Sequence, residues 1–141
     1  MIYKILIFVF LIGVFSCSKE KRVSKNLGGN WTVDLMQVQD GEGYIYFDSL
    51  PQGSFVFLSD QKIISANVAY KYSNLNGFSI KDTFRVEQEK YFFNAKLDRI
   101  FFKVNMDSIN ARIILLTNKS MELEYYDLAK YRLVRFILSK D

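Results

Sequence analysis

Apolar and polar residues alternate along most of the chain beyond residue 30. Because successive side chains of a β-strand point to opposite faces, this alternation predicts strands with one apolar face. The alternation is clearest over residues 31–38, 63–72 and 99–105. Over residues 78–86 the apolar row is interrupted by Asp82. Further strands are predicted over residues 44–47, 53–58, 91–93, 113–116, 121–126 and 131–138, and polar loops, one of them at 105–110, separate them.

These short strands recur about every ten residues, and no amphipathic helix is predicted after residue 17. Regular short strands with turn residues between them favour an antiparallel sandwich or barrel. Closure of an up-and-down sheet into a barrel removes its exposed edges. A barrel of about eight strands is just wide enough to be filled by side chains or to hold one small ligand.

One hairpin near the C-terminus also allows a prediction of register. Pairing Leu116 with Met121 and Ile114 with Leu123 places four apolar side chains on the same face. The glutamates at 122 and 124 then lie on the opposite face, as expected for a sheet with one buried side.

The first 16 residues follow a different pattern. A short positively charged start ending at Lys4 precedes residues 5–15, which are apolar apart from Gly13. At ~1.5 Å per residue, a helix over this run would span only about half of a ~30 Å hydrocarbon core. The segment therefore indicates the apolar region of a signal peptide and not a transmembrane helix.

Residues 14–17, Val-Phe-Ser-Cys, resemble the lipobox of bacterial lipoproteins, in which the chain is cut before the cysteine. Ser16 is small, as the motif requires, while Phe15 replaces the usual small residue; looser lipoboxes of this kind are familiar in Bacteroidota. The resemblance implies that acyl chains on Cys17 hold the chain in a membrane, with ordinary secretion or a short anchor as alternatives. Acylation would also consume the only cysteine, which cannot form an intramolecular disulfide.

Residues 17–28 are expected to form a flexible tether between the lipid and the domain. Ser18 follows the cysteine where the inner-membrane retention signal of enterobacteria has Asp, and no acidic run follows. The periplasmic face of the outer membrane is therefore the expected location, ahead of the cell surface. The basic residues of the tether could touch anionic headgroups, although a solvated linker is the simpler interpretation.

Composition adds bounds on size and partners. Of 141 residues, 125 remain after the first 16, which is the length of one domain. The apolar fraction of 50% and the aromatic fraction of 16% suit a strand-rich core. The net charge of +4 forms no concentrated basic face in the domain, so no nucleic-acid partner is expected.

Gly29-Asn30-Trp31 resembles the Gly-x-Trp motif at the start of the first strand of lipocalins. Residues 53–60, a glycine followed by alternating aromatics and Asp60, resemble a second recurrent motif of bacterial lipocalin-like domains, with Gln61 where a glycine is usual. Over residues 29–138 the chain thus resembles a lipocalin-like lipoprotein of Bacteroidota.

This resemblance implies an antiparallel up-and-down β-barrel of eight to ten strands over residues 29–141. It also implies that Gly29 and Trp31 close one end of the barrel as a structural motif. In lipocalins a basic residue of the last strand covers the tryptophan, and both Arg132 and Arg135 are candidates here.

The residue inventory argues against catalysis. The chain has no histidine, which rules out Ser-His-Asp and Cys-His arrangements and histidine-ligated zinc or haem. It also lacks a glycine-rich phosphate loop, a recognisable pair of catalytic carboxylates and a turn rich enough in oxygen ligands for calcium. We therefore expect no enzyme, no cofactor and no metal.

Two functions remain. In the first, which the family resemblance favours, the barrel binds a small apolar or amphipathic ligand, and its inward aromatic residues face that ligand. The candidate ligand-facing residues are Phe55, Phe57, Phe84 and Phe102. In the second, the barrel is filled and serves as a structural or accessory subunit that meets an envelope protein. An open interior cavity of ~300 Å³ would support the first hypothesis, and a packed interior the second.

Overall fold

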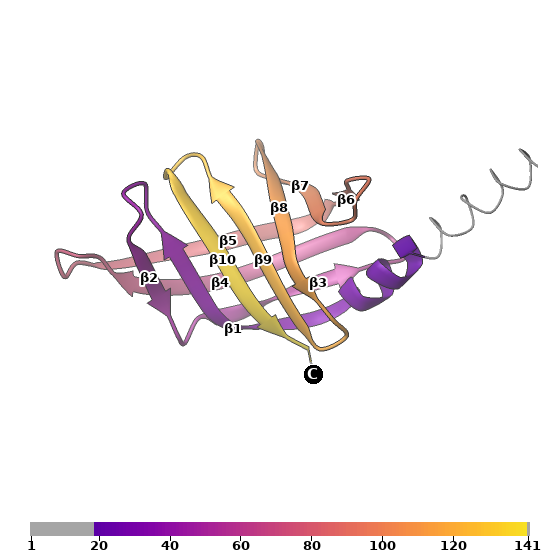
Figure 1. Ribbon diagram of the computed structural model, residues 1–141, viewed down its shortest axis with the longest axis horizontal. Helices are drawn as coiled ribbons and strands as arrows, with labels where there is room; N and C mark the ends of the chain where they lie inside the picture. Colours follow the sequence, from indigo (N-terminus) through magenta and orange to yellow (C-terminus); the bar gives the residue numbers. More distant parts are fainter. Residues whose placement is uncertain (1–18, 141) are drawn as a thin grey trace, which may run out of the picture.

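The structure is a computed structural model that describes residues 19–140 (Figure 1). The signal peptide, the cleavage site and Cys17 lie outside the described residues. Residues 19–27 form a helix, and ten strands follow it. The strands are β1 (Gly29–Gln39), β2 (Ile45–Asp48), β3 (Gln52–Leu58), β4 (Ile63–Ser73), β5 (Ser79–Lys90), β6 (Phe92–Phe93), β7 (Arg99–Val104), β8 (Asp107–Leu116), β9 (Ser120–Asp127) and β10 (Arg132–Ser139).

The strands form one antiparallel sheet with the order β5-β4-β3-β1-β10-β9-β8-β7-β6, and β2 pairs with the second half of β1. Most neighbours in sequence are therefore neighbours in the sheet, the exceptions being β2 with β3 and β5 with β6. β10 returns to pair with β1. β5 stands at one end of this order and β7 next to the other end, and these two strands pack against each other, with the rings of Phe84 and Phe102 6.5 Å apart. This arrangement confirms the predicted up-and-down β-barrel.

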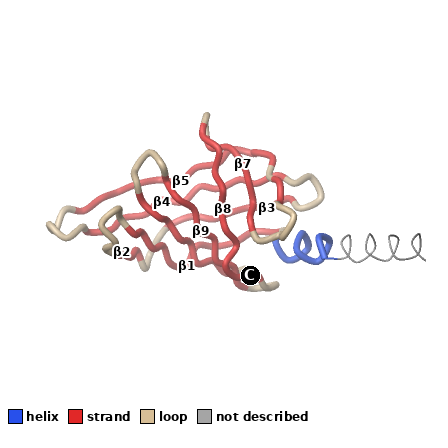
Figure 2. Tube along the Cα trace, turned by 45° about the horizontal axis from the view of Figure 1, so that its top comes forward, coloured by secondary structure: helices blue, strands red, loops and turns tan. Residues whose placement is uncertain are grey.

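The barrel has two different ends (Figure 1, Figure 2). The tether end is formed by the helix and by the turns at residues 59–62, 94–98 and 117–119. The mouth is formed by the hairpin turns at residues 40–44, 74–78, 105–106 and 128–131.

The side chains of alternate strand positions fill the space between these ends. The ring of Phe136 lies 5.2 Å from that of Phe55 and 5.4 Å from that of Phe84, centroid to centroid. The ring of Tyr125 lies 5.2 Å from that of Phe84. All four residues are buried, so the middle of the barrel is a packed aromatic core.

The segment expected to be a flexible tether is instead helical over residues 19–27. Lysine, glutamate and arginine are good helix formers, and the helix stops at Gly28, whose N–H donates to Ser24 O at 2.9 Å. Leu27, the last residue of the helix, is completely buried, and Lys62 Nζ lies 2.9 Å from Glu20 Oε1. The helix is thus fixed to the barrel by tertiary contacts, which the sequence of residues 19–27 alone does not predict.

Two details of the hairpins around β8 differ from expectation. The predicted loop at residues 105–110 is mostly strand, because Asn105 takes a left-handed conformation with φ 56° and allows a tight turn. Leu116 pairs with Met121 as predicted, but Ile113 and not Ile114 lies opposite Leu123. A bulge between Ile113 and Leu115 inserts one residue and shifts the alternation.

Candidate functional site

Trp31 lies at the tether end and is fully buried. Its Nε1–H donates to Leu27 O at 2.8 Å, so the ring supports the C-terminal end of the helix. Gly29 has a φ of +124°, and a Cβ at this position would lie 3.2 Å from Lys140 Cε. Glycine suits this position because it adopts the positive φ without strain and has no Cβ to crowd the side chain of Lys140.

The cation over Trp31 is Lys140, and neither Arg132 nor Arg135 takes this place. Lys140 Nζ lies 4.5 Å from the centroid of the Trp31 ring and donates to Asn26 O at 2.8 Å and Gly28 O at 2.6 Å. Burial lowers the pKa of Lys140. The two arginines lie too early in β10 to reach the tether end, whereas Lys140 directly follows that strand.

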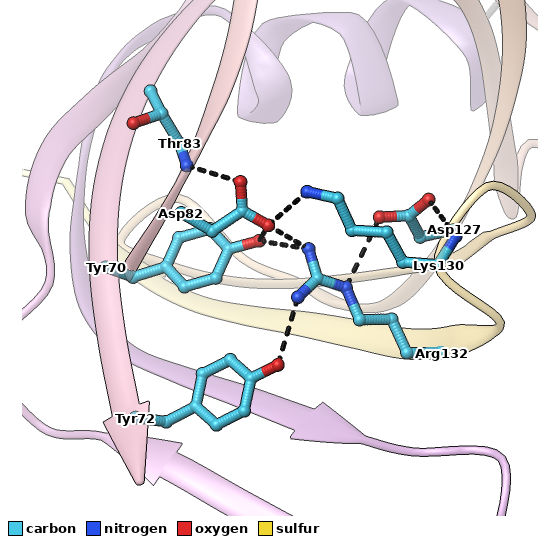
Figure 3. Close-up of polar contacts among 7 residues, drawn as sticks. All are labelled: Tyr70, Tyr72, Asp82, Thr83, Asp127, Lys130 and Arg132. Atoms are coloured by element: carbon cyan, nitrogen blue, oxygen red, sulfur yellow. Dashed lines mark hydrogen bonds and ion pairs between the residues drawn. The ribbon is translucent and has the colours of Figure 1, made fainter. Parts of the chain in front are cut away.

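Arg132 lies at the opposite end of the barrel, where it joins three strands (Figure 3). Its guanidinium donates from Nε to Asp127 Oδ2 at 3.3 Å, from Nη1 to Tyr72 OH at 3.1 Å and from Nη2 to Tyr70 OH at 2.8 Å. Nη2 also donates to Asp82 Oδ2, which accepts a further hydrogen bond from Lys130. We call these six residues the Arg132 cluster.

Strand register brings the members of the Arg132 cluster together. Tyr70 and Asp82 are direct partners across β4 and β5, and Arg132 and Asp127 are direct partners across β9 and β10. Tyr72 lies two residues after Tyr70 and so points to the same inner face. Asp82 is the residue that interrupts the apolar row of β5, and this interruption is the one signal in the sequence that marked the cluster.

The electrostatics of the Arg132 cluster are balanced. The side chains of Arg132, Asp82 and Asp127 are only 7%, 17% and 16% exposed. Burial by itself would raise the pKa of Asp82, but hydrogen bonds from Lys130 and Arg132 lower it to about 2. Burial raises the pKa of Tyr70, so its phenol stays protonated.

These properties define what the cluster can do. Two cations face two carboxylates, and each nitrogen of the Arg132 guanidinium already donates to a neighbour. A hydrogen-bonded cluster without net charge is suited to holding β4, β5, β9 and β10 together beneath the mouth. It is poorly suited to proton transfer or to nucleophilic attack, both of which need a free base.

The four candidate ligand-facing phenylalanines all point into the barrel and are buried. Phe57 packs on Phe55 at 6.3 Å and on Tyr91 at 5.7 Å, and Phe102 packs on Phe84 at 6.5 Å. Their partners in the structure are therefore other rings of the core. Contact of these four residues with a ligand remains a prediction.

Hollows occur on the surface of the barrel and at its ends. At the mouth, a hollow of about 490 Å³ lies beside the Arg132 cluster, with Val38, Ile80 and Tyr131 in its wall. At the tether end, a groove of about 740 Å³ separates the helix from the turn at 117–119. Within residues 19–140, no group of three acidic, histidine or cysteine side chains is placed to hold a metal ion. The helix of the described region is too short and too polar to cross a membrane.

No family model matches the sequence, and no curated protein matches it. Among solved structures, a deswapped triple mutant of the bovine odorant-binding protein is similar over 82% of this chain and 74% of its own, with 10% identity and a TM-score of 0.44. A redesigned β-barrel is similar over 85% of this chain and 96% of its own, with 11% identity and a TM-score of 0.38. At these scores the likeness carries no argument about function, and the barrel assignment rests on strand order and register.

The low pKa of Asp82 predicts acid sensitivity. Its folded-state pKa of about 2 lies below the ordinary value of 3.8, so ionisation of Asp82 stabilises the fold above about pH 4. This contribution should be lost as the pH falls from about 4 to about 2. A carboxyl NMR titration should give a pKa near 2 for Asp82, and an ordinary value would contradict the bonding described above. Urea unfolding of Asp82→Asn should show a shallower loss of stability over the same pH interval.

Proposed function

We propose that this chain is a lipid-anchored, non-catalytic docking module of the bacterial cell envelope that binds a partner protein through its mouth. One observation carries the proposal: large apolar side chains are exposed on the hairpins of the mouth, while the interior is packed. The exposed fractions are 98% for Met106, 73% for Leu128, 70% for Tyr131 and 68% for Phe78. Leu50 and Phe92, which are 80% and 62% exposed, lie away from the mouth, but each of the four residues named here is on a mouth turn. Exposed large apolar side chains are typical of an interaction surface.

The anchor in this proposal is the acylated Cys17 on the periplasmic face of the outer membrane. The first described residue of the helix is residue 19, two residues after Cys17 in the sequence. Two residues of any backbone conformation span at most ~7 Å, so the lipid would hold the tether end close to the membrane. Because the helix is docked on the barrel, the mouth would face away from that membrane, toward a partner.

A second candidate keeps the small amphipathic ligand but places it at the mouth. The hollow of about 490 Å³ there combines apolar Val38 and Ile80 with charged side chains of both signs, the cations Lys81 and Lys130 and the carboxylates Asp40 and Asp82. Such a wall suits a ligand with an apolar body and a polar or zwitterionic head. The packed aromatic core makes this hollow a better place for a ligand than the barrel interior.

Native mass spectrometry of the protein extracted from its own membrane tests both candidates. We expect a complex with another protein, and we expect the triple variant Phe78→Ser, Leu128→Ser, Tyr131→Ser to lose that partner. Leu58→Ser with Phe92→Ser is the matched control, because these exposed residues lie away from the mouth. An adduct of small-molecule mass would favour the second candidate, and a partner retained equally by both variants would contradict docking through the mouth.

A further inference from the structure

The groove at the tether end lies between the helix and the β8–β9 hairpin. It has a volume of about 740 Å³. Arg22 and Lys25, one helical turn apart, line it from the helix, and Thr117 and Asn118 line it from the hairpin turn. Among residues 19–140, no acidic side chain lines this groove.

The wall of the groove is divided by polarity. Arg22 and Lys25 are exposed at its rim. Val23, Leu97 and Ile113 are half-buried and form an apolar wall below them. The bulge in β8 leaves two more apolar residues, Ile114 and Leu115, 38% and 42% exposed at this end.

Leu97 is held in the groove at a conformational cost. Its φ of 61° lies in the left-handed region, where a bulky residue is rare. Hydrogen bonds hold the turn, since the Leu97 N–H donates to Asn94 O at 3.1 Å and the Ile113 N–H donates to Asp98 O at 2.7 Å. A glycine would fit this backbone without strain, so the leucine contributes only its side chain.

We propose that this groove binds an anionic phospholipid of the membrane that anchors the chain. The phosphate would lie between Arg22 and Lys25, and the first carbons of an acyl chain would contact Leu97 and its apolar neighbours. Charge complementarity selects an anionic headgroup, and the lipid anchor proposed for Cys17 would keep such lipids within reach. The inference rests on that anchor, and it would add a specific lipid contact that fixes the orientation of the barrel.

The test uses the full chain extracted from its membrane and transferred into nanodiscs of phosphatidylcholine alone or of phosphatidylcholine with an equal part of phosphatidylglycerol. Native mass spectrometry then counts the lipids retained when the discs are dissolved. We expect the wild type to retain phosphatidylglycerol in preference to phosphatidylcholine. Arg22→Ala with Lys25→Ala should lower this retention ~30-fold, at about 1 kcal/mol for each basic side chain near an anionic surface.

Two variants separate charge from shape. Lys103→Ala with Arg112→Ala removes the same charge from exposed positions outside the groove and should retain the lipid. Leu97→Gly removes one apolar side chain of the wall without straining the turn, so it should fold normally and retain less lipid. Equal retention of both lipids by the wild type, or equal losses in the two charge variants, would overturn the proposal. The intact mass of the same sample reports acylation of Cys17, so failure of the anchor is distinguishable from failure of the groove.

Discussion

Arg132→Met should lower the free energy of unfolding by about 3–5 kcal/mol, the usual cost of removing one partner from a buried ion pair. The substitution leaves Asp82 and Asp127 without their common donor, at 17% and 16% exposure. It also removes the hydrogen bonds that Arg132 donates to the hydroxyl groups of Tyr70 and Tyr72. Urea denaturation at neutral pH measures the effect, which should shrink in acid as the stranded carboxylates become protonated.

Arg135→Met is the matched control on the same strand. Arg135 pairs with Glu124 on the outer face, with Nη2 2.7 Å from Oε2, and the two side chains are 34% and 12% exposed. Arg135→Met should cost less than Arg132→Met, because it leaves one carboxylate without its donor and its own side chain is more open to solvent. Equal losses in the two methionine variants would mean that the Arg132 cluster does not hold the mouth together. The triple variant Arg132→Met, Asp82→Asn, Asp127→Asn should recover part of the lost stability.

Trp31→Ala should lower the free energy of unfolding by about 3–5 kcal/mol, because it opens a large cavity at the tether end. The same change removes the donor to Leu27 O and the ring beneath Lys140 Nζ. The helix should therefore detach more readily than the barrel unfolds. Hydrogen exchange of the amides in residues 19–27, measured beside urea denaturation, should show this difference.

Two variants sharpen the test at Trp31. Trp31→Phe keeps most of the buried area and loses the hydrogen bond, so it should cost less than the alanine substitution and still speed exchange in the helix. Phe92→Ala removes an aromatic ring that is 62% exposed and should change stability little. Unchanged exchange in residues 19–27 of Trp31→Ala would show that the helix docks independently of Trp31.

The strands could be predicted because the barrel buries only one face of each, and a period of two is visible without any tertiary information. The bulge after Ile113 could not be predicted in this way, since alternation continues on both sides of an inserted residue. The helix over residues 19–27 was missed for a related reason. Its sequence shows no apolar stripe, and Leu27, Lys62 and Lys140 fix it through contacts made only after the barrel forms.

Among the candidate functional residues, those in a local motif could also be predicted from the sequence, and those defined by strand pairing could not. Gly29 and Trp31 were recognised as a motif, and one arginine of β10 was expected to cover the ring. The expectation failed because the motif does not say which end of β10 is near Trp31, whereas the register places Ser139 opposite Thr32. Asp82 could be recognised in the sequence because it interrupts the apolar row of β5. Only the pairing of β4 with β5 shows that Tyr70 lies opposite Asp82.

Because β1 pairs with β10, the barrel cannot be completed before β10 has been made. Val33 lies opposite Leu138, and Met36 lies opposite Phe136. A chain made from its N-terminus therefore presents one unpaired edge of β1 until β10 has been made, and unpaired strand edges promote aggregation. Pairing over such a sequence distance is also slow to form. We expect nascent or C-terminally clipped chains to depend on a holding chaperone, and the intact barrel to need none.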